Sequence, residues 1–309
     1  MATLTISPAE EKRVKALGFL SNKGTDNFSG RVITVNGKVT AEQMACVAEA
    51  ARLFGNGVVT MTTRLTLEVQ GIPFDRIEDF RAYIARAGLV TGGTGAKVRP
   101  VVSCKGTTCR FGLIDTFDLS EKIHHRFFEG YGDVKLPHKF KIAVGGCPNN
   151  CVKPDLNDVG IVGQRIPMFD EEKCRGCSKC GVIAECPMHA ASLADGKLQR
   201  DETVCNNCGR CIGKCYFHAM DEGKTAYKVY IGGRWGKQTA SGRALSRLMM
   251  SEGEVLDMVE KCLLLFKKMG QPGERFANTI DRLGFDKVEE MLYSDELLSE
   301  KEVILKCGE

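Results

Sequence analysis

The sequence of 309 residues predicts an α+β protein that is interrupted by a cysteine-rich module. Three observations support this fold class. Strand-like and helix-like hydrophobic periodicities alternate through residues 31–88. Between Pro167 and Asp221 the composition shifts abruptly to cysteines and loop-forming residues. The α/β pattern then resumes at "AYKVYIGGRWG", from Ala226, and ends in helical segments.

A strand, a helix, a second strand and a second helix follow one another in the first part of the chain. The first helix is well marked, because Thr40 and Gln43 form a capping box and the apolar stripe ends at Gly55. This order suggests a small ferredoxin-like domain. The four segments are expected at residues 31–35, 40–54, 57–72 and 75–87.

The rest of the chain divides around the cysteine-rich segment. A buried strand should lead into Cys104, a helix should span about residues 113–128, and "KFKIAVGGC" reads as a strand that ends at Cys147. We expect four parts: an N-terminal extension at 1–24, a ferredoxin-like half-domain at 25–95, a larger α/β domain at 96–166 and 223–309, and an inserted module at 167–222.

Charge and targeting signals exclude some classes of protein. The net charge is only +4, and basic residues are interspersed with acids, which argues against nucleic acid as a partner. The first thirty residues lack the features of a secretory signal, and no apolar run approaches the length of a membrane span. These features predict a cytoplasmic protein without a membrane span.

Fifteen cysteines are the most informative feature, since thiols in a cytoplasmic chain stay reduced and favour metal binding. The module holds two CxxCxxC runs, each followed by a fourth cysteine, which is typical of [4Fe-4S] clusters and not of zinc. In two-cluster ferredoxins the fourth cysteine of each run serves the other cluster. The expected ligand sets are Cys174, Cys177, Cys180 with Cys215, and Cys205, Cys208, Cys211 with Cys186.

The first run has five residues, Gly181 to Glu185, before its last cysteine, where the standard spacing has three. We interpret these residues as a local loop insertion. Four further cysteines, Cys104, Cys109, Cys147 and Cys151, lie in two glycine-containing loops. Their spacing alone leaves a third cluster, a zinc ion and a redox disulfide open. Cys46 and Cys262 fit a helical core, and Cys307 reads as a free thiol near the chain end.

Five stretches together resemble the siroheme sulfite and nitrite reductases, and within that family the anaerobic, dissimilatory type of sulfite reductase that carries an inserted two-cluster ferredoxin domain. They are "VTMTTRLTLEVQGI", "SCKGTTCRFGLIDT", "LPHKFKIAVGGCPNNC", the two-run module and "YKVYIGGRWG". The resemblance implies that Cys104, Cys109, Cys147 and Cys151 hold a third [4Fe-4S] cluster, with Cys151 bridging it to the siroheme iron. The first pair is separated by four residues, where the family usually has five.

The resemblance also implies an anion cage of two arginines and two lysines, here Arg31, Arg64, Lys139 and Lys141. Clustered cations would hold a sulfur or nitrogen oxyanion and help to protonate its departing oxygens. Lys139 and Lys141 should alternate onto one face of a strand. Siroheme carries eight carboxylates, and the positions that resemble its contacts are Arg99, Asn149, Gly232, Gly233, Arg234 and Gly236.

The implied activity is the six-electron reduction of sulfite to sulfide, with electrons relayed through the clusters to siroheme. The chain lacks a dinucleotide fingerprint, so NADH-linked partner subunits with flavin and further iron-sulfur clusters should supply electrons. Single-chain family members have two homologous halves, which predicts a homodimer or assembly within a larger complex. Two alternatives stay open: a siroheme nitrite reductase that forms ammonia, and an electron-transfer subunit without siroheme.

Overall fold

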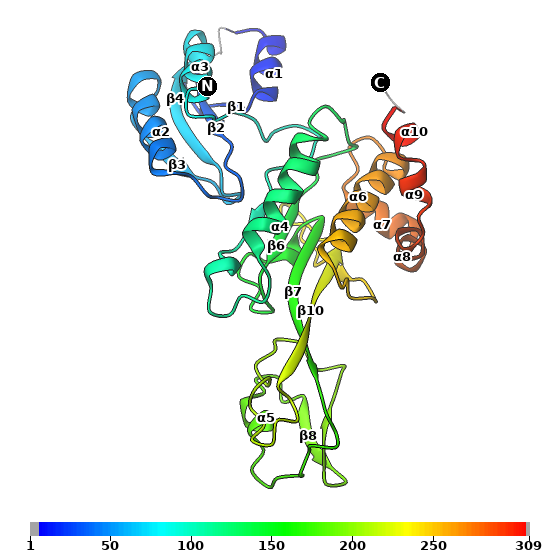
Figure 1. Cartoon of the computed structure of the whole chain (residues 1–309). Helices are drawn as coiled ribbons and strands as arrows, with labels where there is room; N and C mark the ends of the chain where they lie inside the picture. Colours follow the sequence, from blue (N-terminus) through cyan, green and yellow to red (C-terminus); the bar gives the residue numbers. More distant parts are fainter. Residues whose placement is uncertain (1–5, 307–309) are drawn as a thin grey trace. The chain divides into compact units, whose positions relative to one another are not determined.

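A computed structural model describes residues 6–306 (Figure 1). The chain forms two compact units, each built from more than one segment. The first unit consists of the chain up to Ser103, Ser120–Ala143 and the residues from Val259 onward. The second unit consists of Cys104–Leu119 and Val144–Met258. Cys307 lies outside the described residues.

The N-terminal part of the first unit is an antiparallel sheet with the strand order β1-β2-β4-β3, packed against helices. Its hydrophobic core includes Phe28 of the sheet, Val47 of α2 and Phe80 of α3, all fully buried. Val14 of α1 and Phe19 of β1 join the same core. The bounds are α1 Pro8–Ala16, β1 Phe19–Ser21, β2 Asn27–Val32, α2 Ala41–Phe54, β3 Val59–Met61, β4 Leu67–Pro73, a 3-10 turn Phe74–Arg76 and α3 Ile77–Ala85.

The predicted capping box of α2 is confirmed. The Thr40 hydroxyl accepts a hydrogen bond from the Gln43 backbone N–H, and the Gln43 side chain accepts one from the Thr40 N–H. These two bonds satisfy donors that the first turn of a helix leaves without partners. The N–H of Gly55 donates to Ala51 at the other end of the helix.

Two strand predictions in this unit are wrong. Residues 57–72 form a hairpin of β3 and β4 instead of one strand, because the Thr62 N–H donates to the Thr66 carbonyl (2.9 Å) and Leu65 adopts a left-handed φ of 59°. β2 starts at Asn27 and ends at Val32, so it contains only the beginning of the predicted strand at 31–35. The chain turns after Val32, where Asn36 is also left-handed.

A second sheet has five strands in the order β11-β10-β7-β6-β5. β7 and β10 pair antiparallel over ten residues, from Val159 opposite Ile231 to Met168 opposite Glu222. The N–H of Cys104, which directly follows β5, donates to the carbonyl of Val144 in β6 (3.1 Å). The bounds are β5 Val102–Ser103, β6 Ile142–Gly145, β7 Val159–Met168, β10 Glu222–Ile231 and β11 Arg243–Ala244.

The cysteine-rich insert follows β7 and precedes β10 (Figure 1). It contains α5 Gly181–Glu185 and the hairpin of β8 Ala191–Ala194 with β9 Lys197–Arg200. The loop predicted between Cys180 and Cys186 is therefore wrong, since these five residues form a short helix. Its Val182 is buried with Leu198 and Met220 in a small core of the insert, which gives the extra residues a packing role.

Helices complete the structure. The helix predicted at about 113–128 is found as α4 Thr116–Ile123, continued by a π-helix, His124–Glu129. The C-terminal helices are α6 Glu252–Met269, α7 Phe276–Leu283, α8 Phe285–Tyr293, α9 Glu296–Ser299 and α10 Lys301–Lys306, and short 3-10 turns lie at Gly106–Thr108 and Pro154–Leu156. Among residues 6–306, no helix combines the length and apolar character needed to cross a bilayer.

Candidate functional site

The eight cysteines of the insert line two separate cavities. One cavity is lined by Cys174, Cys177, Cys180 and Cys215, which we call the Cys174 set. The other is lined by Cys186, Cys205, Cys208 and Cys211, which we call the Cys205 set. Each set takes three cysteines from one run and the fourth from the other run, in the grouping that the sequence predicts.

Electrostatics also group the Cys205 set. Burial, together with the neighbouring Cys208, Cys205 and Cys186, raises the pKa of Cys211 to about 11. Such thiols become thiolates when they bind a metal. Within residues 6–306, no three side chains of His, Cys, Asp or Glu are arranged around a single metal ion. A [4Fe-4S] cube takes each thiolate on a different iron, so its ligands stand further apart than those of one ion.

The third cysteine group belongs to two loops of the second unit that approach through glycines. A Cβ on Gly146 would lie 2.8 Å from the Cα of Gly106, and one on Gly106 would lie 2.9 Å from the Cα of Gly146. Any larger residue at either position would force the loops apart. The close approach brings the Gly146 N–H to 3.2 Å from the Cys104 Sγ.

Further hydrogen bonds fix the loop around Cys104. The Thr116 hydroxyl donates to the Cys104 carbonyl (2.7 Å), and the Thr107 hydroxyl donates to the Asp115 carboxylate (2.6 Å). The Leu113 N–H donates to the Gly146 carbonyl (2.9 Å) and joins the two loops. Backbone and threonine contacts therefore position the loop that carries Cys104 against the loop of Gly146.

Cys147 lies among the other three thiols of this group. Burial raises its pKa, a hydrogen bond with the Asn149 backbone opposes this, and the neighbouring Cys104, Cys151 and Cys109 raise it further. Cys151 is exposed, whereas the other three are half-buried. The arrangement suits a cluster whose fourth thiolate can also reach a second group.

Cations gather in the first unit around the glycine-rich loop after α3. Arg31 of β2 and Arg99 both donate to the Gly93 carbonyl, at 3.4 and 2.5 Å. Arg31 also forms an ion pair with Glu68 of β4 (3.1 Å). Burial, together with the positive charges of Arg31 and Arg275, lowers the pKa of Arg99 to about 10.

His138 and Lys139 extend this group. Burial lowers the pKa of His138, and Arg275, Lys139 and Arg99 lower it further. His138 Nδ1 accepts a hydrogen bond from the Lys139 N–H (2.7 Å), which requires an unprotonated Nδ1. We call four residues the cationic cluster, namely Arg31, Arg99, Lys139 and Arg275, and His138 lies beside them. Sequence reasoning missed Arg275, which is far from the others in sequence, and it did not select His138 as a site residue.

Lys139 and Lys141 precede β6, which begins at Ile142, so the prediction that they stand on a regular strand is wrong. A single β-bridge between Phe140 and Val98 keeps the alternation, with Phe140 fully buried between two half-buried lysines. The Arg64 guanidinium donates to the Pro100 carbonyl (2.6 and 3.0 Å) and the Ile142 carbonyl (3.1 Å). These contacts fix Arg64 near the start of β6.

The remaining predicted cofactor contacts lie in the second unit. The Gly232 N–H donates to the Asp158 carbonyl (2.9 Å), and a Cβ on Gly233 would lie 2.1 Å from the Asp155 carbonyl oxygen. Arg234 and Ala240 exchange backbone hydrogen bonds (2.9 and 3.0 Å) in a tight loop. A Cβ on Gly236 would meet no atom within 4 Å, and Asn149 is exposed beside Cys147.

The observed side chains fit the groups that the sequence implies. The Nε atoms of Arg31 and Arg99 are buried without a hydrogen-bond partner in the described part of the chain. Several cations held close together would be stabilised by a ligand with many carboxylates, such as siroheme. Each of the three cysteine groups supplies the four soft thiolates that one [4Fe-4S] cluster takes.

The chain belongs to the nitrite and sulfite reductase family. The model of the nitrite and sulphite reductase 4Fe-4S domain matches residues 94–301, and that of the nitrite/sulfite reductase ferredoxin-like half domain matches residues 21–87. A relative from Methanocaldococcus jannaschii named coenzyme F420-dependent sulfite reductase is 34% identical over 235 residues, which are 75% of this chain and 37% of the relative.

Two further proteins are similar to the chain at lower sequence identity. The C subunit of the anaerobic sulfite reductase of Salmonella typhimurium is 26% identical over 227 residues, 66% of this chain and 64% of the relative. The solved structure of dissimilatory sulfite reductase I (DsrI) has a TM-score of 0.68 at 22% identity, covering 86% of this chain and 69% of that chain. This last likeness shows the fold. The chain thus spans about a third to two thirds of the two named sulfite reductase relatives.

Proposed function

We propose that the chain is the catalytic, siroheme-bearing subunit of a sulfite reductase that converts sulfite to sulfide with six electrons. The observation that carries the proposal is the combination, in one chain of this family, of the Cys104, Cys109, Cys147 and Cys151 loops with the cationic cluster. A plain two-cluster ferredoxin needs neither feature.

The cysteine groups would hold three [4Fe-4S] clusters, and Cys151 would bridge the third to siroheme. The exposure of Cys151 supports this role, because a bridging thiolate must be reachable from outside its own cluster. Arg99 would bind siroheme carboxylates, together with Asn149 and the loop of Gly232, Gly233, Arg234 and Gly236. When bound, the clusters would supply electron transfer, and siroheme would supply an iron atom to which the sulfur of sulfite can bind.

Four cations would act on the substrate itself. Arg31 and Arg64 would hold the sulfite oxygens, since guanidinium groups present several N–H donors in a fixed fork. Lys139 and Lys141 would donate protons to the oxygens, each of which leaves as water. The contacts of Arg64 with two backbone carbonyls support this role, because they orient its guanidinium before substrate arrives.

Electrons would come from partner subunits with flavin and further iron-sulfur clusters, in an NADH-linked cytoplasmic complex. The first relative is named for coenzyme F420, so reduced F420 is the second donor to assay. We further propose a homodimer, or pairing with a related subunit, because this chain holds one half-domain match. An active enzyme that elutes from gel filtration at monomer mass would contradict the pairing.

The decisive experiment is the visible spectrum of anaerobically purified protein, followed by acid extraction of the cofactor and iron analysis. We expect siroheme and about thirteen irons per chain. About eight irons without siroheme would favour an electron-transfer subunit instead.

Nitrite reduction to ammonia is the second candidate, because the matched family model covers both activities. Rates with sulfite and with nitrite, measured with a reduced viologen donor, separate the two. Faster turnover of nitrite would replace sulfite as the substrate in this proposal.

A further inference from the structure

The two cysteine sets of the insert have different surroundings. A cavity beside the Cys205 set is lined by both Cys208 and Cys147, so it adjoins the third cysteine group as well. Pro148, Asn149 and Gly209 form part of its wall. The Cys205 set is therefore the neighbour of the Cys147 loop.

Backbone contacts fix this neighbourhood. The Arg165 N–H of β7 donates to the Asn207 carbonyl (2.8 Å), and Arg165 forms a parallel β-bridge with Cys208. Gly209 has a φ of 70°, and a Cβ there would lie 2.9 Å from the Cβ of Arg165. The second cysteine run is thus held against β7 at a position that only glycine fits.

The charges around the cavity shared by Cys147 and Cys208 are positive. Its charged lining residues are Arg110 and Arg210. The Arg110 guanidinium lies over the ring of Phe111 at 5.1 Å. Arg210 makes a long, half-exposed contact with Glu185 (3.7 Å), which neutralises its charge weakly.

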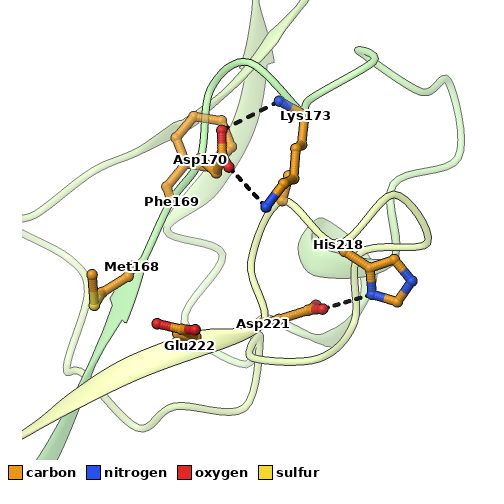
Figure 2. A pocket seen from close by; sticks show the side chains of 8 residues that line it. Met168, Phe169, Asp170, Lys173, His218, Asp221 and Glu222 are labelled. Carbon is orange, nitrogen blue, oxygen red and sulfur yellow. Dashed lines mark hydrogen bonds and ion pairs between the residues drawn. The ribbon is translucent and has the colours of Figure 1, made fainter.

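The Cys174 set has a different environment. Phe169 and Ala219 line both its cavity and an adjoining pocket, shown in Figure 2. The ionisable side chains of that pocket are Asp170, Lys173, His218, Asp221 and Glu222. Lys173 is paired with Asp170 (3.0 Å) and His218 with Asp221 (2.6 Å), so carboxylates outnumber the permanent cations. Arg175 also lines the cavity of the Cys174 set.

Reduction adds one negative charge to an iron-sulfur cluster and its thiolates. Nearby cations stabilise the reduced form and raise the reduction potential, whereas nearby carboxylates lower it. Cations lie beside both sets, because Arg200 is 3.9 Å from the Cys205 Sγ and Lys197 donates to the Cys174 carbonyl (3.1 Å). The adjoining cavities differ, since they hold Arg110 and Arg210 beside Cys208 but Asp170, Asp221 and Glu222 beside the Cys174 set. This difference in charge makes the two sets unequal sites for an added electron.

We propose that Arg110 and Arg210 raise the reduction potential at the Cys205 set, so that this set is reduced more readily than the Cys174 set. The inference rests on the proposed function, in that both sets must hold [4Fe-4S] clusters. The difference would give electron transfer a direction. An electron in the insert would reside preferentially on the Cys205 set, beside Cys147, and electrons from the donor would enter at the Cys174 set.

The test is a potentiometric titration of the purified full-length protein with dithionite as the one-electron reductant, followed by electron paramagnetic resonance. Cys177→Ser and Cys208→Ser variants, each lacking one cluster, assign the two signals. We expect the Cys205 signal to appear at the higher potential. The double variant Arg110→Gln/Arg210→Gln should move that midpoint to lower potential and leave the Cys174 midpoint unchanged.

Two matched variants complete the design. Arg175→Gln should lower the midpoint of the Cys174 signal instead, and Arg52→Gln on the exposed face of α2 should change neither. Iron content per chain verifies that each variant retains its clusters.

The outcomes separate this inference from the proposed function. A Cys205 midpoint that is the lower of the two, or that ignores the double substitution, overturns the inference even if the protein reduces sulfite. Ordered midpoints that shift as expected support the inference even if sulfite turnover is absent. An insert without clusters overturns both.

Discussion

The cysteine-rich insert and the cationic cluster differ in how far apart in sequence their members lie. Each cysteine set combines two runs of one short segment, and the spacing rules of ferredoxins predict the grouping that lines each cavity. The cationic cluster draws on distant segments. Arg31 lies in β2, Arg99 follows a glycine-rich loop, and Arg275 directly precedes α7. Local spacing encodes the first arrangement, whereas the second depends on the fold.

The largest expected effect separates the third cysteine group from the insert. Cys151→Ser should reduce the rate of sulfite turnover by about a hundredfold or more, because a serine hydroxyl is a poor ligand for iron. The two clusters of the insert should survive, since their ligands lie in other cavities. Iron content, the siroheme absorption bands and turnover with reduced viologen measure both parts. A fully active variant would refute the role of Cys151.

Arg64 tests the cationic side of the comparison. Arg64→Gln should reduce kcat/KM for sulfite by about 10²- to 10³-fold, because a preorganised charge at the oxyanion is removed. Arg64→Lys should recover part of the loss, since an ammonium keeps the charge but cannot donate to both carbonyls in the same fork. Equal activity of all three proteins would exclude Arg64 from the substrate site.

Gly146 tests whether close loop approach is needed for the third cysteine group. Gly146→Ala should destabilise the fold by about 1–3 kcal/mol and weaken cluster binding there, because its Cβ would overlap the Cα of Gly106. Gly253→Ala in α6 is the matched control, since its nearest atom lies 3.8 Å away and helix propensity improves. Urea unfolding and iron analysis compare the two. Identical behaviour would contradict the steric argument.

The smallest expected effect is the titration of His138. Its pKa is lowered in the folded protein, so the unfolded chain binds the proton first as the pH falls. Stability should therefore decline by a fraction of about 1 kcal/mol as the pH falls below about 6.5, and level off below the folded-state pKa.

His138→Asn removes this titration while Asn can still accept the Lys139 N–H. Urea midpoints compared at about pH 7.5 and about pH 5.5 measure the difference between the two proteins. A variant that loses as much stability on acidification as the wild type would assign the pH dependence to other groups.

Sequence reasoning performed best where one local interaction decides the structure. Thr40 and Gln43 marked the start of α2, because a capping box is specified within four residues. It failed at 57–72, because the alternating pattern continues through the turn between the two strands. Leu65 adopts a left-handed backbone in that turn, which is uncommon for a leucine and cannot be predicted from the residue type. It also failed at 181–185, where the burial of Val182 favours a helix over a loop.

The candidate site divides in the same way. Four cysteines, Cys104, Cys109, Cys147 and Cys151, were predicted as one group through the family resemblance, and the structure gathers the other three around Cys147. Arg275 joins Arg99 only through tertiary folding, so no spacing rule could have found it. Among the predicted residues, the ligand roles and the anion cage stay predictions until cofactor and substrate are bound.

The ten-residue pairing of β7 with β10 has a consequence for how such a chain could arise and be engineered. Met168 and Glu222 face each other across the ladder, so the insert enters and leaves at adjacent points, as the loop of an ordinary hairpin does. Replacing the residues between them with a two-residue turn would preserve the strand register. The insert is in this sense the loop of a hairpin, and grafting it onto another antiparallel hairpin would require recipient strands that end side by side and that keep the backbone contacts of Arg165 with Asn207 and Cys208.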